Sequence, residues 1–302
     1  MKPDMPTTST TAPSGSWLSP IPIFFVFLWS TGFIIAKFGL PYAPPLTFLV
    51  IRCVGAVLFL IPLVLIWKAP WPPRSDVRHI AVAGLLLQAG YLGGVWCAIK
   101  IGMPAGLSAL IVGMQPVLTA VAAPLIGERV RPRQWLGLGL GLTGVALVVV
   151  AKINMIGLST AAILFCVFAL CSITAGTMYQ KHFCPRFDLR TGTVIQFSAS
   201  AAVLLPLAIL FEDFDLHLAQ VTWSPQFIGA LLWSICGLSI GAIFLLFQLI
   251  RRSDATQVTS LLYLTPPTTA IMAWLMFGEA FNLLGIVGMV VAVAGVAFVV
   301  KK

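Results

Sequence analysis

Charged side chains are scarce in this sequence. They make up 9% of its 302 residues, whereas a soluble domain carries about 25%. Hydrophobic residues make up 59%, which leaves too little polar surface to cover a fold in water. The composition therefore excludes a water-soluble globular protein and indicates a chain that lies in a bilayer.

Ten apolar runs are long enough to cross the hydrocarbon core, which takes roughly 17–25 helical residues. They cover residues 20–40, 45–67, 80–99, 104–126, 134–151, 156–179, 191–211, 226–250, 255–277 and 282–300. The connections are short, so no sizeable domain is expected outside the membrane. The sequence predicts an all-α membrane protein with ten transmembrane helices.

Aspartate, glutamate and histidine are absent from these spans, in which Lys37 and Arg52 are the only charged residues. An intramembrane hydrolase needs paired carboxylates, an activated serine or metal-binding histidines at bilayer depth, so this class is excluded and the chain is not expected to be an enzyme. The spans also lack a carboxylate that could bind an organic cation, which disfavours cationic drugs as substrates. No cofactor or metal is expected.

Paired cysteines are missing as well. The six cysteines form no Cys-x-x-Cys pair and five lie within spans, which excludes a zinc site and a disulfide framework. They are expected to serve as small apolar side chains. The set is Cys53, Cys97, Cys166, Cys171, Cys184 and Cys236.

The net charge of +9 is distributed by topology rather than in a patch for nucleic acid. With a cytoplasmic N-terminus, 14 of the 18 lysines and arginines fall on the inner side and three on the outer side, while Arg52 lies within a span. Because basic residues favour the cytoplasmic side, both termini are predicted to be cytoplasmic. Residues 1–19 are predicted to be a disordered tail, and the first apolar run is too long for a signal peptide.

The two halves of the chain resemble each other. The aligned positions, at offsets of 151 and 144 residues, include Pro116 with Pro267, Gly127-Glu128 with Gly278-Glu279, Gly144 with Gly295, Lys37 with Lys181, and Pro62 with Pro206. Repeats over 20–151 and 152–302 would hold five helices each. Since five is odd, the second copy enters the membrane from the opposite side, and inverted repeats are typical of transporters.

These residues resemble the EamA family of the drug/metabolite transporter superfamily. The resemblance rests on Trp29-Ser30, Lys37, Arg52, Lys100, Ala109, Gln115-Pro116 and Gly127-Glu128, and in the second half on Pro266-Pro267, Gly278-Glu279 and Gly295. It implies a multi-pass exporter or permease of small metabolites, amino acids or drugs in the cell (inner) membrane. One departure is that Arg52 aligns with Gln196, so a site built on Arg52 would be asymmetric.

Arg52 lies roughly 10 Å from the outer end of the second helix. A buried arginine there costs at least ~2.5 kcal/mol and should face a cavity or a partner. It is predicted either to anchor a substrate carboxylate or phosphate, or to cap carbonyls of a neighbouring helix. Lys37 is nearer the interface, where its stem can reach the headgroups, although a substrate contact stays open.

Prolines near the middle of the fourth and ninth spans point to a binding site at the midplane. Pro116, Pro266 and Pro267 each free a backbone carbonyl four residues earlier. Neutral polar and aromatic residues could complete the site or hold helices together. They are Trp29, Gln88, Tyr91, Trp96, Gln115, Tyr179, Gln196, Gln248 and Tyr263.

Two further motifs have ordinary explanations. Glu128 and Glu279 end the fourth and ninth spans, where each favours the N-terminus of the next helix or, alternatively, forms a gate. Gly139-x-Gly141-x-x-Gly144 matches a dinucleotide fingerprint but lacks the strand that this motif requires. Gly137 with Gly141, and Gly288 with Ala292, instead predict close packing of the fifth and tenth helices, and a homodimer could use the same face.

Together these features predict a secondary transporter that exports or exchanges a small amino acid-like or anionic metabolite by alternating access. The alternatives are a membrane channel and a non-transporting scaffold or sensor. The expected partners are the substrate and the lipid bilayer.

Overall fold

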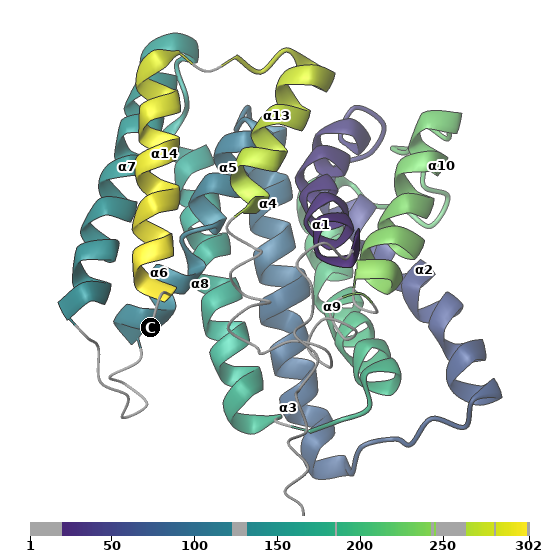
Figure 1. Cartoon of the computed structure of the whole chain (residues 1–302). Coiled ribbons are helices and arrows are strands. Elements are labelled where there is room, and N and C mark those ends of the chain that lie inside the picture. Colours follow the sequence, from purple (N-terminus) through teal and green to yellow (C-terminus); the bar gives the residue numbers. More distant parts are fainter. Residues whose placement is uncertain are drawn as a thin grey trace, which may run out of the picture.

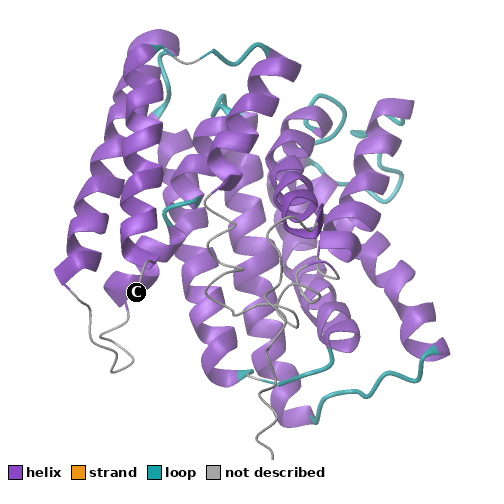
Figure 2. Ribbon diagram, in the orientation of Figure 1, coloured by secondary structure: helices purple, strands orange, loops and turns teal. Residues whose placement is uncertain are grey.

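The computed structural model describes residues 20–122, 132–184, 186–242, 245, 264–280 and 282–300, and all of them are helix or loop (Figure 2). The first half contains α1 (Pro20–Gly39), α2 (Pro45–Ile66), α3 (Arg74–Gly84), η1 (Leu85–Gly90), α4 (Tyr91–Lys100), α5 (Ala105–Val112), α6 (Gln115–Ala122) and α7 (Pro132–Ile156). The second half contains α8 (Thr160–Phe183), α9 (Leu189–Glu212), α10 (Pro225–Leu232), η3 (Trp233–Ala242), α13 (Thr265–Phe277) and α14 (Leu283–Val300).

Over its described residues, each of the ten predicted spans corresponds to one helix or to two or three successive helices. Six are long and apolar enough over their described residues to cross a membrane. The third span is α3, η1 and α4 in one run, and the fourth is α5 and α6 with a break between them. The 1–19 tail lies outside the described residues.

Local sequence sets where several helices begin and end. The side chains of Ser159, Asp188 and Ser224 accept hydrogen bonds from backbone N–H groups in the first turns of α8, α9 and α10. Gly278 ends α13 with a φ of 66°, a left-handed conformation that glycine adopts without strain. The helix ends set by these caps lie within a few residues of the ends of the apolar runs.

The apolar side chains divide into a buried core and a surface suited to lipid. Phe48 is fully buried, and its ring lies tilted against the Trp96 ring with centroids 4.3 Å apart. The Phe48 and Phe227 rings form a T-shaped contact with centroids 5.5 Å apart. Large apolar side chains such as Leu210 and Ile66 are about 70% exposed. Such exposure suits hydrocarbon rather than water.

α7 and α14 pack side by side at one edge of the bundle (Figure 1). A Cβ placed on Gly144 would lie 2.3 Å from the Ala292 nitrogen, and one on Gly288 would lie 2.7 Å from the Gly144 oxygen. The prediction that the fifth and tenth helices pack closely through small residues is confirmed. Since this face is buried within the chain, a homodimer would have to use another surface.

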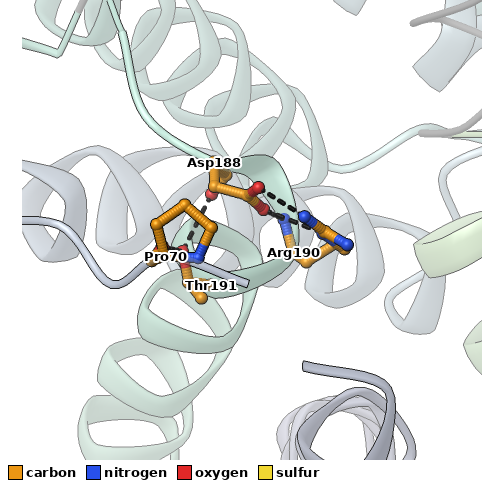
Figure 3. Close-up of polar contacts among 4 residues, drawn as sticks. All are labelled: Pro70, Asp188, Arg190 and Thr191. Atoms are coloured by element: carbon orange, nitrogen blue, oxygen red, sulfur yellow. Dashed lines mark hydrogen bonds and ion pairs between the residues drawn. The ribbon is translucent and has the colours of Figure 1, made fainter. Parts of the chain in front are cut away.

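α2 and α9 also pack against each other, and each contains a proline, Pro62 and Pro206. At one end of this pair the 67–73 connection meets the start of α9 (Figure 3). Thr191 donates a hydrogen bond to the Pro70 carbonyl at 2.9 Å. The Arg190 side chain donates two hydrogen bonds to the Asp188 carboxylate, at 3.1 and 2.7 Å.

Asp188 should make stability depend on pH. The Arg190 guanidinium beside it lowers the pKa of this carboxyl below its ordinary value of 3.8. Because the pKa is lower in the folded state, the stabilisation is complete above the ordinary value and is lost as pH falls through the folded value. The melting temperature of Asp188→Asn in detergent should lie below that of the parent at pH 7, and the gap should narrow progressively as pH falls below about 4. A gap that persists unchanged at pH 3 would contradict this account, and exposed Asp213→Asn is the control.

Candidate binding site

A cavity of about 180 Å³ lies between helices of both halves of the chain. α1, α2, η1 and α4 of the first half supply part of its wall, and α8, α9 and η3 of the second half supply the rest. Its polar and aromatic lining residues are Trp29, Phe33, Arg52, Gln88, Tyr91, Trp96, Phe197, Ser234 and Ser239. The other lining residues are aliphatic or glycine.

Arg52 is the charged residue in this wall. It lies seven residues into α2 as predicted and is 6% exposed. Its Nε and Nη2 atoms donate to the Ser239 Oγ at 3.3 and 3.1 Å, and its guanidinium lies 5.8 Å from the centre of the Phe197 ring. Within the described chain no carboxylate pairs with Arg52, and no backbone carbonyl accepts from it, so the carbonyl-capping alternative is not what the structure contains.

Ser239, the hydrogen-bond partner of Arg52, lies in the π-helical segment η3. The Ser239 hydroxyl donates to the Ser234 carbonyl, five residues earlier, at 2.9 Å. The Ser234 hydroxyl is fully buried and has no hydrogen-bond partner among the residues that the structure describes. η1, which carries Gln88, is a second π-helical segment at the corresponding place in the first half. Such segments are frequent at functional sites.

A second compartment of about 50 Å³ adjoins the first, because Trp29, Phe33, Tyr91 and Ile173 line both. It lies where the fourth span is broken between α5 and α6, and Gln115, Pro116 and Thr265 line it. The Gln115 Nε2 donates to the Thr177 hydroxyl at 2.9 Å. Thr265 is 5% exposed, and within the described part of the chain its hydroxyl has no hydrogen-bond partner.

The proline positions of the two halves meet at this break. A Cβ on Gly113 would lie 2.8 Å from the Pro266 side chain, so the α5–α6 break packs directly on the start of α13. Pro266 and Pro267 lie in the first turn of α13, where a missing N–H costs little. The residues before Leu264, including Tyr263, lie outside the described residues.

The structure brings together most of the predicted site residues but not all of them. Trp29, Arg52, Gln88, Tyr91 and Trp96 line the main cavity, and Gln115 and Pro116 line the second compartment. The Tyr179 hydroxyl instead lies 2.8 Å from the His79 Nδ1, which links α8 to α3. Gln196 donates to the Gln180 side chain, which links α9 to α8. Gln248 and Glu128 lie outside the described residues.

Lys37 and Glu279 form an ion pair away from the cavity, with Lys37 Nζ and Glu279 Oε1 2.5 Å apart. The same carboxylate accepts hydrogen bonds from the backbone N–H groups of Ala105 and Gly106, at 3.1 and 3.4 Å. Two expectations are corrected here. Lys37 pairs with a carboxylate of the other half rather than reaching for headgroups, and Glu279 stabilises the N-terminus of α5 rather than that of the tenth helix.

Sequence reasoning missed Ser234, Ser239, Phe197 and Thr265. One signal was available for the serines, which lie five residues apart in an apolar span, the spacing of a π-helical hydrogen bond. In the part of the chain that the structure describes, no three His, Cys, Asp or Glu side chains cluster as metal ligands. The described cysteines are all free thiols.

The chain matches known transporters along most of its length. The model of the EamA-like transporter family matches residues 20–150 and 160–301. An uncharacterized transporter, YvbV, of Bacillus subtilis is 28% identical, over 92% of this chain and 90% of that one. A "probable amino-acid metabolite efflux pump" of Salmonella typhimurium is 26% identical, over 90% and 91% respectively.

Two further comparisons agree with this match. An uncharacterized inner membrane transporter, YedA, of Escherichia coli is 25% identical, over 84% of this chain and 81% of that one. A protein of solved crystal structure has the same fold, with a TM-score of 0.64 at 18% identity, over 92% of this chain and 94% of that one.

Proposed function

Since the chain belongs to the EamA-like transporter family, whose members are transporters and not enzymes, we propose that it is a secondary transporter working by alternating access. It is a multi-pass membrane protein. Its location is the cell inner membrane, because the relative YedA of Escherichia coli is named an inner membrane transporter. Its substrate is a small metabolite with an anionic or zwitterionic group. The direction is export, in keeping with the efflux pump of Salmonella typhimurium.

The architecture that serves this function is two inverted repeats of five helices, 20–151 and 152–302. Contacts between connections support the inversion. The Thr222 nitrogen donates to the Tyr42 carbonyl at 2.8 Å, which joins the first–second and seventh–eighth connections. Thr191 joins the second–third and sixth–seventh connections. Both contacts fit an odd number of helices per repeat. On the distribution of lysine and arginine, both termini lie in the cytoplasm.

One observation carries the substrate assignment, namely the buried Arg52 in the wall of the cavity. Both of its hydrogen bonds go to one oxygen of Ser239, which leaves both Nη1 protons and one Nη2 proton without a partner in the described chain. A guanidinium at bilayer depth is costly without a counter-charge. A bound carboxylate or phosphate would supply that charge through two parallel hydrogen bonds.

The test is counterflow in proteoliposomes with labelled amino acids, organic anions and nucleotides. Saturable exchange should occur in the parent, and Arg52→Gln should weaken it at least about tenfold because a charged hydrogen bond is lost. Arg186→Gln, which removes an equal charge from an exposed connection, should exchange normally. Unchanged exchange in Arg52→Gln would give Arg52 a purely structural role.

The same assay separates the other two functions. A channel would give flux that does not saturate and no counterflow. A scaffold or sensor would give no flux with any member of the panel. Either result would overturn the proposal of a secondary transporter.

A further inference from the structure

We infer that the cavity recognises a small monocarboxylate with an apolar body, and that this substrate needs no amino group. The inference rests on the proposed function and narrows its substrate class. Three properties of the main cavity carry it: its charges, its walls and its size.

The charges favour a single carboxylate. Among the described lining residues of the two compartments, Arg52 is the one ionised side chain and none is aspartate or glutamate. Ser234 lines the same wall, and its buried hydroxyl has no hydrogen-bond partner among the described residues. It is therefore the donor that a small shift of the wall on binding brings to a second carboxylate oxygen. One guanidinium and one hydroxyl suit one carboxylate, whereas a polyanion would bring charges that nothing in the wall neutralises.

An ammonium group would be poorly placed in this cavity. Its hydrogen-bond acceptors would be neutral side chains such as Gln88 and Tyr91, and Arg52 would repel it. It would lose its hydration without gaining an opposite charge. A carboxylic acid that carries an oxo group or only hydrogen on carbon 2, in place of the amino group, avoids the cost of desolvating an ammonium and keeps the contact with Arg52.

The walls and the size define the rest of the molecule. Trp29, Phe33, Trp96 and Phe197 present aromatic surface, and the remaining lining residues are mostly aliphatic. A cavity of about 150 Å³ accommodates benzene, and this one measures about 180 Å³. A branched aliphatic or small aromatic group therefore fits, while a nucleotide or a sugar phosphate exceeds the space and lacks polar partners.

The experiment compares four molecules with one carbon skeleton in proteoliposome counterflow. They are 4-methyl-2-oxopentanoate, 4-methylpentanoate, leucine and leucinamide, which vary the amino and carboxylate groups separately. Both acids without an amino group should exchange with a KM at least about tenfold below that of leucine, since leucine must desolvate its ammonium. Leucinamide, which has no carboxylate, should not exchange.

A pair of serine variants tests the geometry. Ser234→Ala should raise the KM for 4-methyl-2-oxopentanoate about tenfold, the effect of a lost hydrogen bond to a charged group. Ser108→Ala is the matched control, because Ser108 is also fully buried but lines neither compartment. An unchanged KM in Ser234→Ala would overturn the role of that hydroxyl.

The outcomes distinguish this inference from the proposed function. Exchange of leucine without exchange of either desamino acid would overturn the inference and leave the proposed function intact. Exchange of leucinamide alone would overturn both, because a cation would then be the substrate. No saturable exchange with these four molecules or with any anion of the wider panel would likewise overturn both.

Discussion

Gly144→Val should destabilise the folded protein strongly, by about 3 kcal/mol or more. Gly144 lies in the contact between α7 and α14, where a Cβ would be 2.3 Å from the Ala292 nitrogen and 2.5 Å from the Gly288 oxygen. Both obstacles are backbone atoms, so no side-chain rotation relieves the clash and the helices must separate. Overpacking typically costs about 1–3 kcal/mol, and a backbone obstacle places this variant at or above the upper end.

The measurement is the yield of monodisperse protein after detergent extraction and size-exclusion chromatography, followed by its melting temperature. Gly139→Val is the matched control, since Gly139 belongs to the same helix, is exposed and has nothing within 4 Å of an added Cβ. The control should resemble the parent. A normal yield and melting temperature in Gly144→Val would show that the two helices do not pack as described.

Glu279→Gln should lower stability by about 2–3 kcal/mol. Breaking a buried ion pair typically costs about 3–5 kcal/mol, and the lower figure applies because Lys37 is one-third exposed and keeps part of its hydration. Glutamine retains an oxygen that can accept from Ala105 and Gly106 but loses the charge that neutralises Lys37. The melting temperature in detergent should fall by several degrees.

Two companion variants locate the cause. Glu279→Ala should be worse than Glu279→Gln, because the α5 N–H groups then lose their acceptor as well. Lys37→Met should recover part of the stability of Glu279→Gln, since it removes the unpaired cation. Equal melting temperatures for Glu279→Gln and the parent would exclude a structural role for the ion pair.

Much of the fold could be predicted because a membrane span is a local property of the sequence. Over the described residues the ten apolar runs correspond to helices, and Arg52 lies at the depth expected from counting residues into α2. The break in the fourth span also lies near Pro116, although the turn itself is at Gly113 and Met114. Each of these follows from hydrophobicity or backbone geometry within about 25 residues.

Contacts between the halves could not be predicted in the same way. Lys37 and Glu279 are 242 residues apart, and nothing local to either indicates the other. The sequence predicts that Glu279 interacts with the N-terminus of the helix that follows it, whereas the fold places its carboxylate at the N-terminus of α5. The π-helical segments were missed because periodicity hardly separates an i−5 bond from an i−4 bond in a uniformly apolar run.

The packing of α7 against α14 places residues needed for folding apart from residues that line the binding site. Neither helix contributes a described residue to the lining of either compartment, and their contact depends on glycines that tolerate almost no change. Substitutions that change substrate specificity can therefore accumulate in the other helices without disturbing the contact between α7 and α14. A chain built this way can acquire a new substrate while its ability to fold is inherited unchanged.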